Sequence, residues 1–290
     1  LLFPDIVVNE LSTQLLTNPK LEFNNFSATL GFNYNISENS SLFFNQSMAS
    51  RAPNPSELFS DGLHHAIARI ELGDLRFKSE IGHKTDLTYT FESERFNFSV
   101  NPFHNLIQDF ILIEPIGLRE TIRGNFQVWE YRQTQAQMYG LDLDANLSLT
   151  DNVRFVHQFS LVKGYDKTSN EPLISMPAAN TLNSLVYTNP NFNNISIAIQ
   201  SNYVFRQNEF PNTNFEVVLP DSIQTVDIST PPSGYHLLNL NITAAVRPDM
   251  QVGLYVNNLL NTSYRNYLNR LRYYADDVGR NITLQLKYNY

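Results

Sequence analysis

The sequence contains no cysteine, and this absence excludes several kinds of site at once. With 0 cysteines among 290 residues, the chain can form neither a disulfide framework nor a thiolate metal site. A bound metal would have to be held by histidine or carboxylate side chains. Thiol-based redox chemistry of the protein itself is excluded for the same reason.

Basic stretches and long apolar runs are also lacking. The formal net charge is -8, and no Lys/Arg run could neutralise a row of phosphates, which excludes a nucleic-acid partner and favours cations or neutral solutes. No apolar run approaches the ~20 residues of a helical membrane span, and no signal-peptide pattern opens the chain. A membrane-bound form would therefore be a β-barrel, and the abrupt start at Leu1 predicts a mature or partial chain.

Motifs of common enzymes are absent too. The sequence has no G-x-S-x-G, H-E-x-x-H, P-loop or G-x-G-x-x-G pattern, and such motifs place the nucleophiles, metal ligands and phosphate-binding loops of large enzyme classes. Six histidines are present, but none has a spacing that joins it to a serine. We therefore expect a protein that is not an enzyme.

The main positive signal is alternation of apolar and polar residues with a period of two. Residues 281–290 place Thr283, Gln285, Lys287 and Asn289 on one face of a strand and apolar or aromatic residues, ending in Tyr290, on the other. Phe 20 and Tyr 15 against Trp 1 fit the aromatic girdles of membrane barrels. Helical spacing is hardly visible, so an all-β chain is predicted. Eleven strands are expected, at 22–34, 40–50, 79–91, 95–115, 126–149, 152–164, 178–188, 193–206, 235–246, 249–259 and 279–290.

The connections between these strands alternate between short and long. Tight turns rich in Asn, Pro, Asp and Ser are followed by long links. Outer-membrane barrels have this asymmetry, with short periplasmic turns and long extracellular loops. A soluble β-sandwich is the alternative that the alternation alone leaves open. The long links are 51–78, 116–125, 165–177, 207–234 and 260–278, and the strands at 95–115 and 126–149 are long enough to project beyond a membrane.

Several segments resemble those of one family. The resemblance is carried by RAPNPSEL at 51–58, EIGHKTDL at 80–87, YGLDLD at 139–144, and VGLYVNNLLNTSY at 252–264 followed by Gly279-Arg280-Asn281. An Asp stands at 142 where the family more often has Glu. Together these segments are similar to the TonB-dependent outer-membrane receptors, and the likeness covers most of the chain.

This resemblance implies a transmembrane antiparallel β-barrel in the bacterial outer membrane. Residues 1–290 would form its C-terminal part, with eleven of about 22 strands, and neither the plug domain nor the early strands lie in this chain. Such a sheet closes only if other residues complete it. The implied partners are TonB through the plug, outer-membrane lipid, a transported solute and a lipoprotein.

The implied function is import of a scarce solute, such as a metal ion, a metal chelate of the siderophore kind or a similar molecule, bound at extracellular loops. No resident cofactor is expected. A surface adhesion module built as a β-sandwich and a passive porin are the alternatives. We expect the rings of Trp129, Tyr131, Tyr273 and Tyr274 to serve in girdles and loop packing rather than in solute contact.

One predicted loop contains side chains suited to metal. Residues 59–74, FSDGLHHAIARIELGD, resemble a loop of the zinc-acquiring branch of these receptors. They make His64 and His65 candidate ligands, with Asp61 and Glu71 as carboxylate partners, for Zn²⁺ or an Fe or Cu complex. The alternative is that both histidines are solvated loop residues. Because adjacent residues of a strand point to opposite faces, joint ligation requires irregular backbone here.

Overall fold

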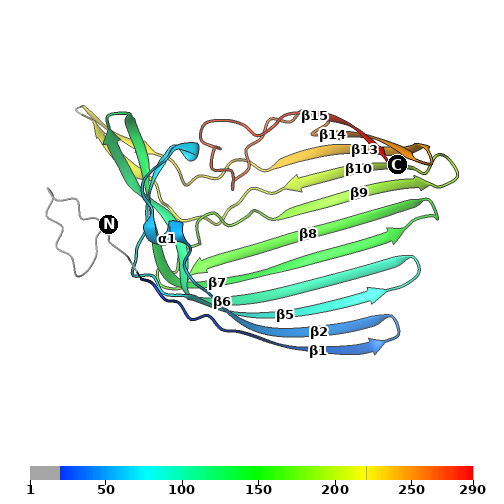
Figure 1. The fold of residues 1–290 in the computed structure, drawn as a ribbon, viewed down its shortest axis with the longest axis horizontal. Helices are drawn as coiled ribbons and strands as arrows, with labels where there is room; N and C mark the ends of the chain where they lie inside the picture. The colour runs from blue at the N-terminus through cyan, green and yellow to red at the C-terminus, as the bar shows by residue number, and fades with distance from the viewer. Residues whose placement is uncertain (1–19, 220, 290) are drawn as a thin grey trace.

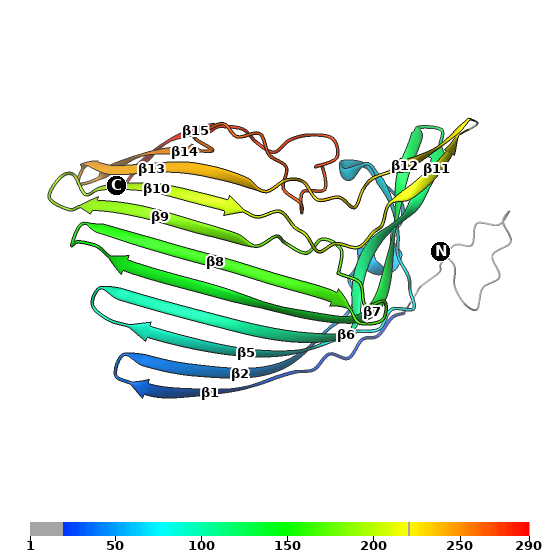
Figure 2. The same ribbon diagram turned by 180° about the vertical axis from the view of Figure 1, so that it is seen from behind.

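A computed structural model describes residues 20–219 and 221–289 and shows a curved, nearly all-β wall (Figures 1 and 2). The main sheet has 13 strands, of which eleven follow one antiparallel path from β1 to β15. This confirms the predicted fold class and places all eleven predicted strands. The path runs β1 (Ser27–Ser37), β2 (Ser40–Arg51), β5 (Glu80–Glu92), β6 (Phe96–Thr121), β7 (Gly124–Ser148), β8 (Val153–Asp166), β9 (Asn180–Asn189), β10 (Ile195–Val204), β13 (Tyr235–Arg247), β14 (Met250–Asn257) and β15 (Asn281–Tyr288).

One face of this sheet is apolar and exposed. In β10, Ile199 lies opposite Leu185 of β9 and Leu240 of β13. Ile199 is 47% exposed and Leu185 is 46% exposed. In-register apolar rows that remain exposed are what a wall in contact with lipid requires.

The other face carries polar side chains that bond across strands. The Asn45 amide donates to Asp86 over 3.0 Å, and the Asn101 amide donates to the Thr88 hydroxyl over 2.6 Å. Cross-strand pairs of this kind satisfy polar groups that face a wet interior. The alternation in the sequence therefore separates two environments.

The turns and loops lie at opposite ends of the strands, as predicted (Figure 1). One predicted loop is wrong. Residues 116–125 are not a loop, because β6 and β7 pair all the way to Thr121 and Gly124 and leave a tight turn of only Ile122 and Arg123. Gly124 has a φ of 117°, which favours glycine at this turn. With 26 and 25 residues, these two strands exceed the ~9–11 residues of a membrane crossing.

The long loops contain elements that the sequence pattern did not reveal. The link after β2 folds into a short helix, a two-stranded hairpin and a 3-10 turn, and its strand β4 pairs in parallel with β7. The link after β10 contains a separate hairpin. Among the described residues no helix is long and apolar enough to cross a membrane. The added elements are α1 (Pro55–Phe59), β3 (Asp61–His64), η1 (His65–Ile67), β4 (Arg69–Leu72), β11 (Phe215–Leu219) and β12 (Ser222–Val226).

The buried apolar clusters lie at the loop end rather than within the wall. One joins Leu112 and Ala136 to Leu173 of the loop after β8, and another joins Leu58 of α1 to Ile111 of β6. The loops are therefore packed onto the strand extensions. The strands β1 and β15 form the two edges of the sheet. The predicted terminal ring, Tyr290, lies outside the described residues, and so does Leu1.

Candidate functional site

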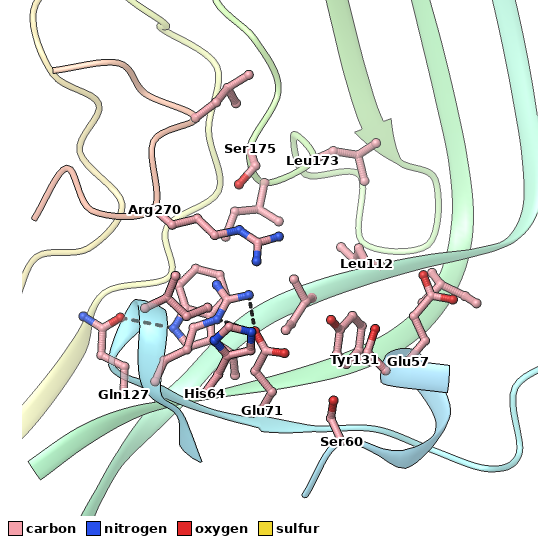
Figure 3. A pocket seen from close by; sticks show the side chains of 18 of the residues that line it. Glu57, Ser60, His64, Glu71, Leu112, Gln127, Tyr131, Leu173, Ser175 and Arg270 are labelled. Atoms are coloured by element: carbon pink, nitrogen blue, oxygen red, sulfur yellow. Dashed lines mark hydrogen bonds and ion pairs between the residues drawn. The ribbon is translucent and has the colours of Figure 1, made fainter. Parts of the chain in front are cut away.

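The loop end of the wall encloses a cavity of about 760 Å³. Its walls come from the loop at 54–71, from β6 and β7 beyond the main span, and from the loops at 173–176 and 267–274 (Figure 3). Small-molecule sites have volumes of about 300–1,000 Å³. The cavity is thus large enough for a small organic molecule or a metal chelate.

A single arginine fixes the loop at 54–71, the first of the segments that line the cavity. The Arg51 guanidinium donates to both Glu57 carboxylate oxygens over 3.0 and 3.1 Å and to Glu80 over 2.7 Å. The second Glu80 oxygen accepts the Ile111 backbone N–H over 2.6 Å. Arg51 therefore joins β2 to α1 and β5, and through Glu80 to β6.

Local sequence fixes the shape of the same loop. The Asn54 side chain accepts the Glu57 N–H over 3.0 Å, and the Glu57 carboxylate accepts the Asn54 N–H over 2.8 Å, which is a capping box at the start of α1. The chain then returns against the helix, where a Cβ at Gly73 would lie 2.6 Å from the Glu57 carbonyl oxygen. Only glycine permits this approach without a shift of the backbone.

The hairpin β3–β4 brings an arginine over the only tryptophan of the chain. Glu71 of β4 lies opposite Trp129 of β7 in the parallel ladder. The Arg69 guanidinium carbon lies 4.5 Å from the Trp129 ring centre, and its Nε donates to Glu71 over 2.7 Å. The Arg69 and Glu71 side chains are only 7% and 6% exposed. Burial, together with the charge of Arg270, lowers the pKa of Arg69 against the opposing effect of Glu71.

The loop at 267–274 supplies further rings and charge. The Arg272 guanidinium carbon lies 4.3 Å from the Tyr267 ring centre and 4.7 Å from that of Tyr273. The Tyr273 hydroxyl donates to the Ile228 carbonyl over 2.9 Å. Burial raises the pKa of Tyr267 and of Tyr273, so both phenols stay neutral hydrogen-bonding groups. This wall is aromatic and cationic.

The residues predicted to bind metal are only partly brought together. His64 and Glu71 both line the cavity, while Asp61 lies at the open end of the hairpin, opposite Leu72. The backbone changes from strand to 3-10 turn between His64 and His65, which is the irregularity that joint ligation requires. Glu71 is already paired with Arg69. Within 20–219 and 221–289 no three His, Asp or Glu side chains are placed to hold a metal ion, and the metal role stays a prediction.

The other histidines lie on separate wall strands. His104 is hydrogen-bonded to Gln137, and His157 to Asn183, over 2.8 and 2.7 Å. These bonds account for polar groups within the wall without any metal.

Sequence reasoning missed the arginines of the cavity. Arg69 lies in one predicted loop, and Arg270 and Arg272 flank Leu271 in another; neither arrangement has a spacing pattern that marks a site. The aromatic residues Trp129 and Tyr131 pack against the loop elements, in line with the expected loop packing, and they also line the cavity. Both residues lie in the part of β7 that extends past a membrane-crossing length. This position in the sequence is the signal that could have assigned them to the cavity.

Comparison with known proteins identifies the family. The family described as TonB dependent receptor-like, beta-barrel matches residues 7–259. No curated protein sequence matches the chain.

Solved structures share the fold. A structure of the copper transporter OprC is 19% identical with a TM-score of 0.72, covering 90% of this chain and 39% of that one. The siderophore receptor PirA from Acinetobacter baumannii is 17% identical with a TM-score of 0.65, covering 91% and 41%. The FrpB iron transporter from Neisseria meningitidis is 19% identical with a TM-score of 0.64, covering 90% and 39%. This chain thus spans about two fifths of the length of these relatives.

The family match extends over most of the chain, and the shared fold agrees with it. Proteins of this family are barrels of the bacterial outer membrane that act in transport and are not enzymes. The exposed apolar face of the sheet agrees with a wall of such a barrel that contacts lipid. The chain belongs to the family of TonB-dependent receptor β-barrels.

Proposed function

We propose that this chain is the loop-bearing part of an importer that captures a scarce solute in the 760 Å³ cavity and releases it to the periplasm. The observation that carries the proposal is the position of the cavity, among the long loops at one end of a barrel wall of this family. Binding there would be followed by gated passage, with no covalent chemistry. TonB, acting through a plug domain, would supply the force, and a lipoprotein at the outer face is a further proposed partner.

Among scarce solutes, a metal chelate suits this cavity better than a bare metal ion. The lining contains rings from Trp129, Tyr131, Tyr267 and Tyr273. Aromatic walls contact organic ligands over large areas and cost little conformational entropy on binding. The copper and iron or siderophore transport named for the structural relatives is consistent with this proposal.

The experiment compares cells that lack the full-length receptor with cells that express it under metal limitation. Cellular iron, copper and zinc are measured by mass spectrometry. We expect the receptor to raise one of the three, and Tyr131→Ala to slow that gain about tenfold, since removing a ring from a binding pocket costs roughly 1–2 kcal/mol.

The matched control is Tyr187→Ala, which removes a 38% exposed ring from β9, away from the cavity. Its uptake should equal that of the unchanged receptor. Equal content of all three metals with and without the receptor would contradict metal-linked import.

Direct capture of Zn²⁺ at His64 and His65 is the second candidate, and the place of His64 in the cavity wall favours it. Titration of Zn²⁺ into the purified receptor in detergent tests it against the His64→Ala, His65→Ala double variant. If the candidate is right, the variant loses binding. Absence of binding, or binding that the variant leaves unchanged, would refute it.

A further inference from the structure

A row of polar side chains interrupts the exposed apolar face of the wall. Where β9 meets β10, the row that contains Leu185 and Ile199 is apolar. Two residues further toward the long loops, the row across β8, β9 and β10 consists of His157, Asn183 and Ser201. Because side chains alternate between the two faces of a strand, these three residues share the face of Ile199. The face that contacts lipid in a barrel of this family thus carries a half-buried polar patch, His157–Asn183–Ser201.

The patch lies within the apolar band and not at its border. On β9, Asn183 comes before Tyr187, whose ring is 38% exposed close to a short turn. On β10, Ser201 comes before Tyr203, whose ring is 41% exposed toward the long loops. Exposed rings mark the two borders of the hydrocarbon region in membrane barrels. Polar groups between these borders meet lipid chains, which offer no hydrogen bonds.

The hydrogen bonds inside the patch leave one acceptor and one donor unused. His157 Nδ1 lies 2.7 Å from the Asn183 side-chain oxygen. Because that oxygen only accepts, Nδ1 carries the proton, and Nε2 of the neutral imidazole is an acceptor. Nε2 has no partner among residues 20–219 and 221–289 and is not enclosed by them. The Asn183 amide donates one N–H to the Thr181 hydroxyl over 3.4 Å, and its second N–H remains.

The surroundings of the patch suit another protein surface better than an anionic lipid headgroup. Ala145 of β7 lies opposite His157, so small side chains, Ala145 and Ser201, lie on both sides of the pair. Small and polar residues are typical of contacts between protein segments inside membranes. The cation on the same face of β8 is Lys163, and it is already paired with Glu209. A phosphate group would therefore find no free counter-charge beside the patch.

We propose that the His157–Asn183–Ser201 patch is a lateral interface at which a second copy of the receptor docks within the membrane. A two-fold axis beside the patch brings His157 of one copy to Asn183 of the partner subunit, and the reverse contact forms by symmetry. Each unused ring nitrogen then accepts the unused amide N–H of the other copy. The patch is self-complementary, because it offers one acceptor and one donor. This interface goes beyond solute import and is independent of which solute is carried.

The test measures self-association of the purified full-length receptor in phosphatidylcholine vesicles. Copies that carry donor or acceptor dyes are mixed, and energy transfer between them is followed as lipid is added. We expect more transfer than random collision gives. The double variant His157→Leu, Asn183→Leu should weaken the association by roughly tenfold, because both hydrogen bonds between the copies are lost.

Urea unfolding in the same vesicles, at high lipid dilution, separates an interface from a structural bond. Leucine suits a position that faces lipid, so the double variant should be as stable as the unchanged receptor or more stable. A pair that only held β8 to β9 would lower the stability when removed. The matched control is Gln46→Leu with Thr85→Val, which removes a cross-strand bond of 2.6 Å on the same face of β2 and β5. This control should associate like the unchanged receptor.

Four results would overturn the interface: transfer no greater than random collision gives, association unchanged in the double variant, association weakened equally in the control, or a double variant that is less stable at high dilution. Lipid that co-purifies with a receptor that does not self-associate, and that the double variant loses, would assign the patch to a lipid headgroup instead. None of these results bears on cellular metal content, so the import function stands or fails separately.

Discussion

Arg51 is the residue on which the shape of the outer loop most depends. Its two carboxylate partners are almost buried, with side-chain exposures of 9% for Glu57 and 11% for Glu80. A buried carboxylate that loses its partner is strongly destabilising. The ion pairs of Arg51 therefore hold the start of the loop from α1 to β4 against the wall.

Arg51→Gln should release this loop while the wall stays folded. The loop should lose about 2–4 kcal/mol of stability, which is less than for a fully buried ion pair because Arg51 itself is 45% exposed. Hydrogen exchange should show lost protection at 54–72. The control is Arg76→Gln, which breaks the more exposed pair with Asp74, and a surface pair contributes only about 0–1 kcal/mol. Equal protection in both variants would show that Arg51 is not the anchor.

Asp276 makes the loop that carries Arg270 sensitive to acid. Hydrogen bonds from Ser263 and Arg265 lower the pKa of Asp276. A lowered folded pKa means that the stabilisation is present above the unfolded value, about 3.9, and is lost as pH falls through the folded value. Amide protection at 262–277, measured relative to the intrinsic exchange rate at each pH, should therefore fall below pH ~4. Asp276→Asn should be loosened already at pH 7 and lack this acid step; an identical acid step in the variant would assign it to another group.

The hairpin β3–β4 is the element that builds the site, and its attachment to β7 is mainly apolar. Ile70 is 4% exposed and lies opposite Val128, itself 5% exposed. Because only four residue pairs hold β4 to β7, side-chain burial must supply much of the docking energy.

Ile70→Ala should undock this hairpin. Removing a buried isoleucine to alanine costs about 2–5 kcal/mol, which exceeds what so short a ladder can retain. We expect faster exchange at 61–72, with unchanged exchange in β8 to β10. Leu63→Ala is the matched control, because half-buried Leu63 lies opposite Ile70 on β3, the strand of the hairpin that does not pair with β7. Full protection of β4 in Ile70→Ala would show that backbone pairing alone suffices.

Sequence reasoning succeeded for the wall elements and failed for the site elements, for one physical reason. Every wall strand separates lipid from water, so each repeats a period-two pattern that is readable without knowing its partners. The strands β3 and β4 have four residues each, and β4 gains its stability from Val128 and Trp129, each 58 residues beyond its partner in the chain. No local pattern records such pairing, and Arg69 could be placed over Trp129 only by the fold.

At the scale of the whole molecule, the two faces of the wall meet different solvents, and adjacent residues of one strand can test this. Ile199 of β10 is 47% exposed on the apolar face. Gln200, the next residue, lies on the polar face and accepts from the Asn241 amide over 3.3 Å. In a sandwich with one buried face, neither position would face lipid.

Ile199→Arg should therefore destabilise the barrel in a bilayer by about 2–4 kcal/mol, since a lipid-facing arginine near the membrane centre costs this much. Gln200→Arg should cost less than about 1 kcal/mol, because the polar face is wet. Urea unfolding of the full-length receptor in lipid vesicles measures both. Equal effects of the two substitutions would mean that both faces meet the same solvent, whereas a large effect at Ile199 alone requires lipid on one side and water on the other.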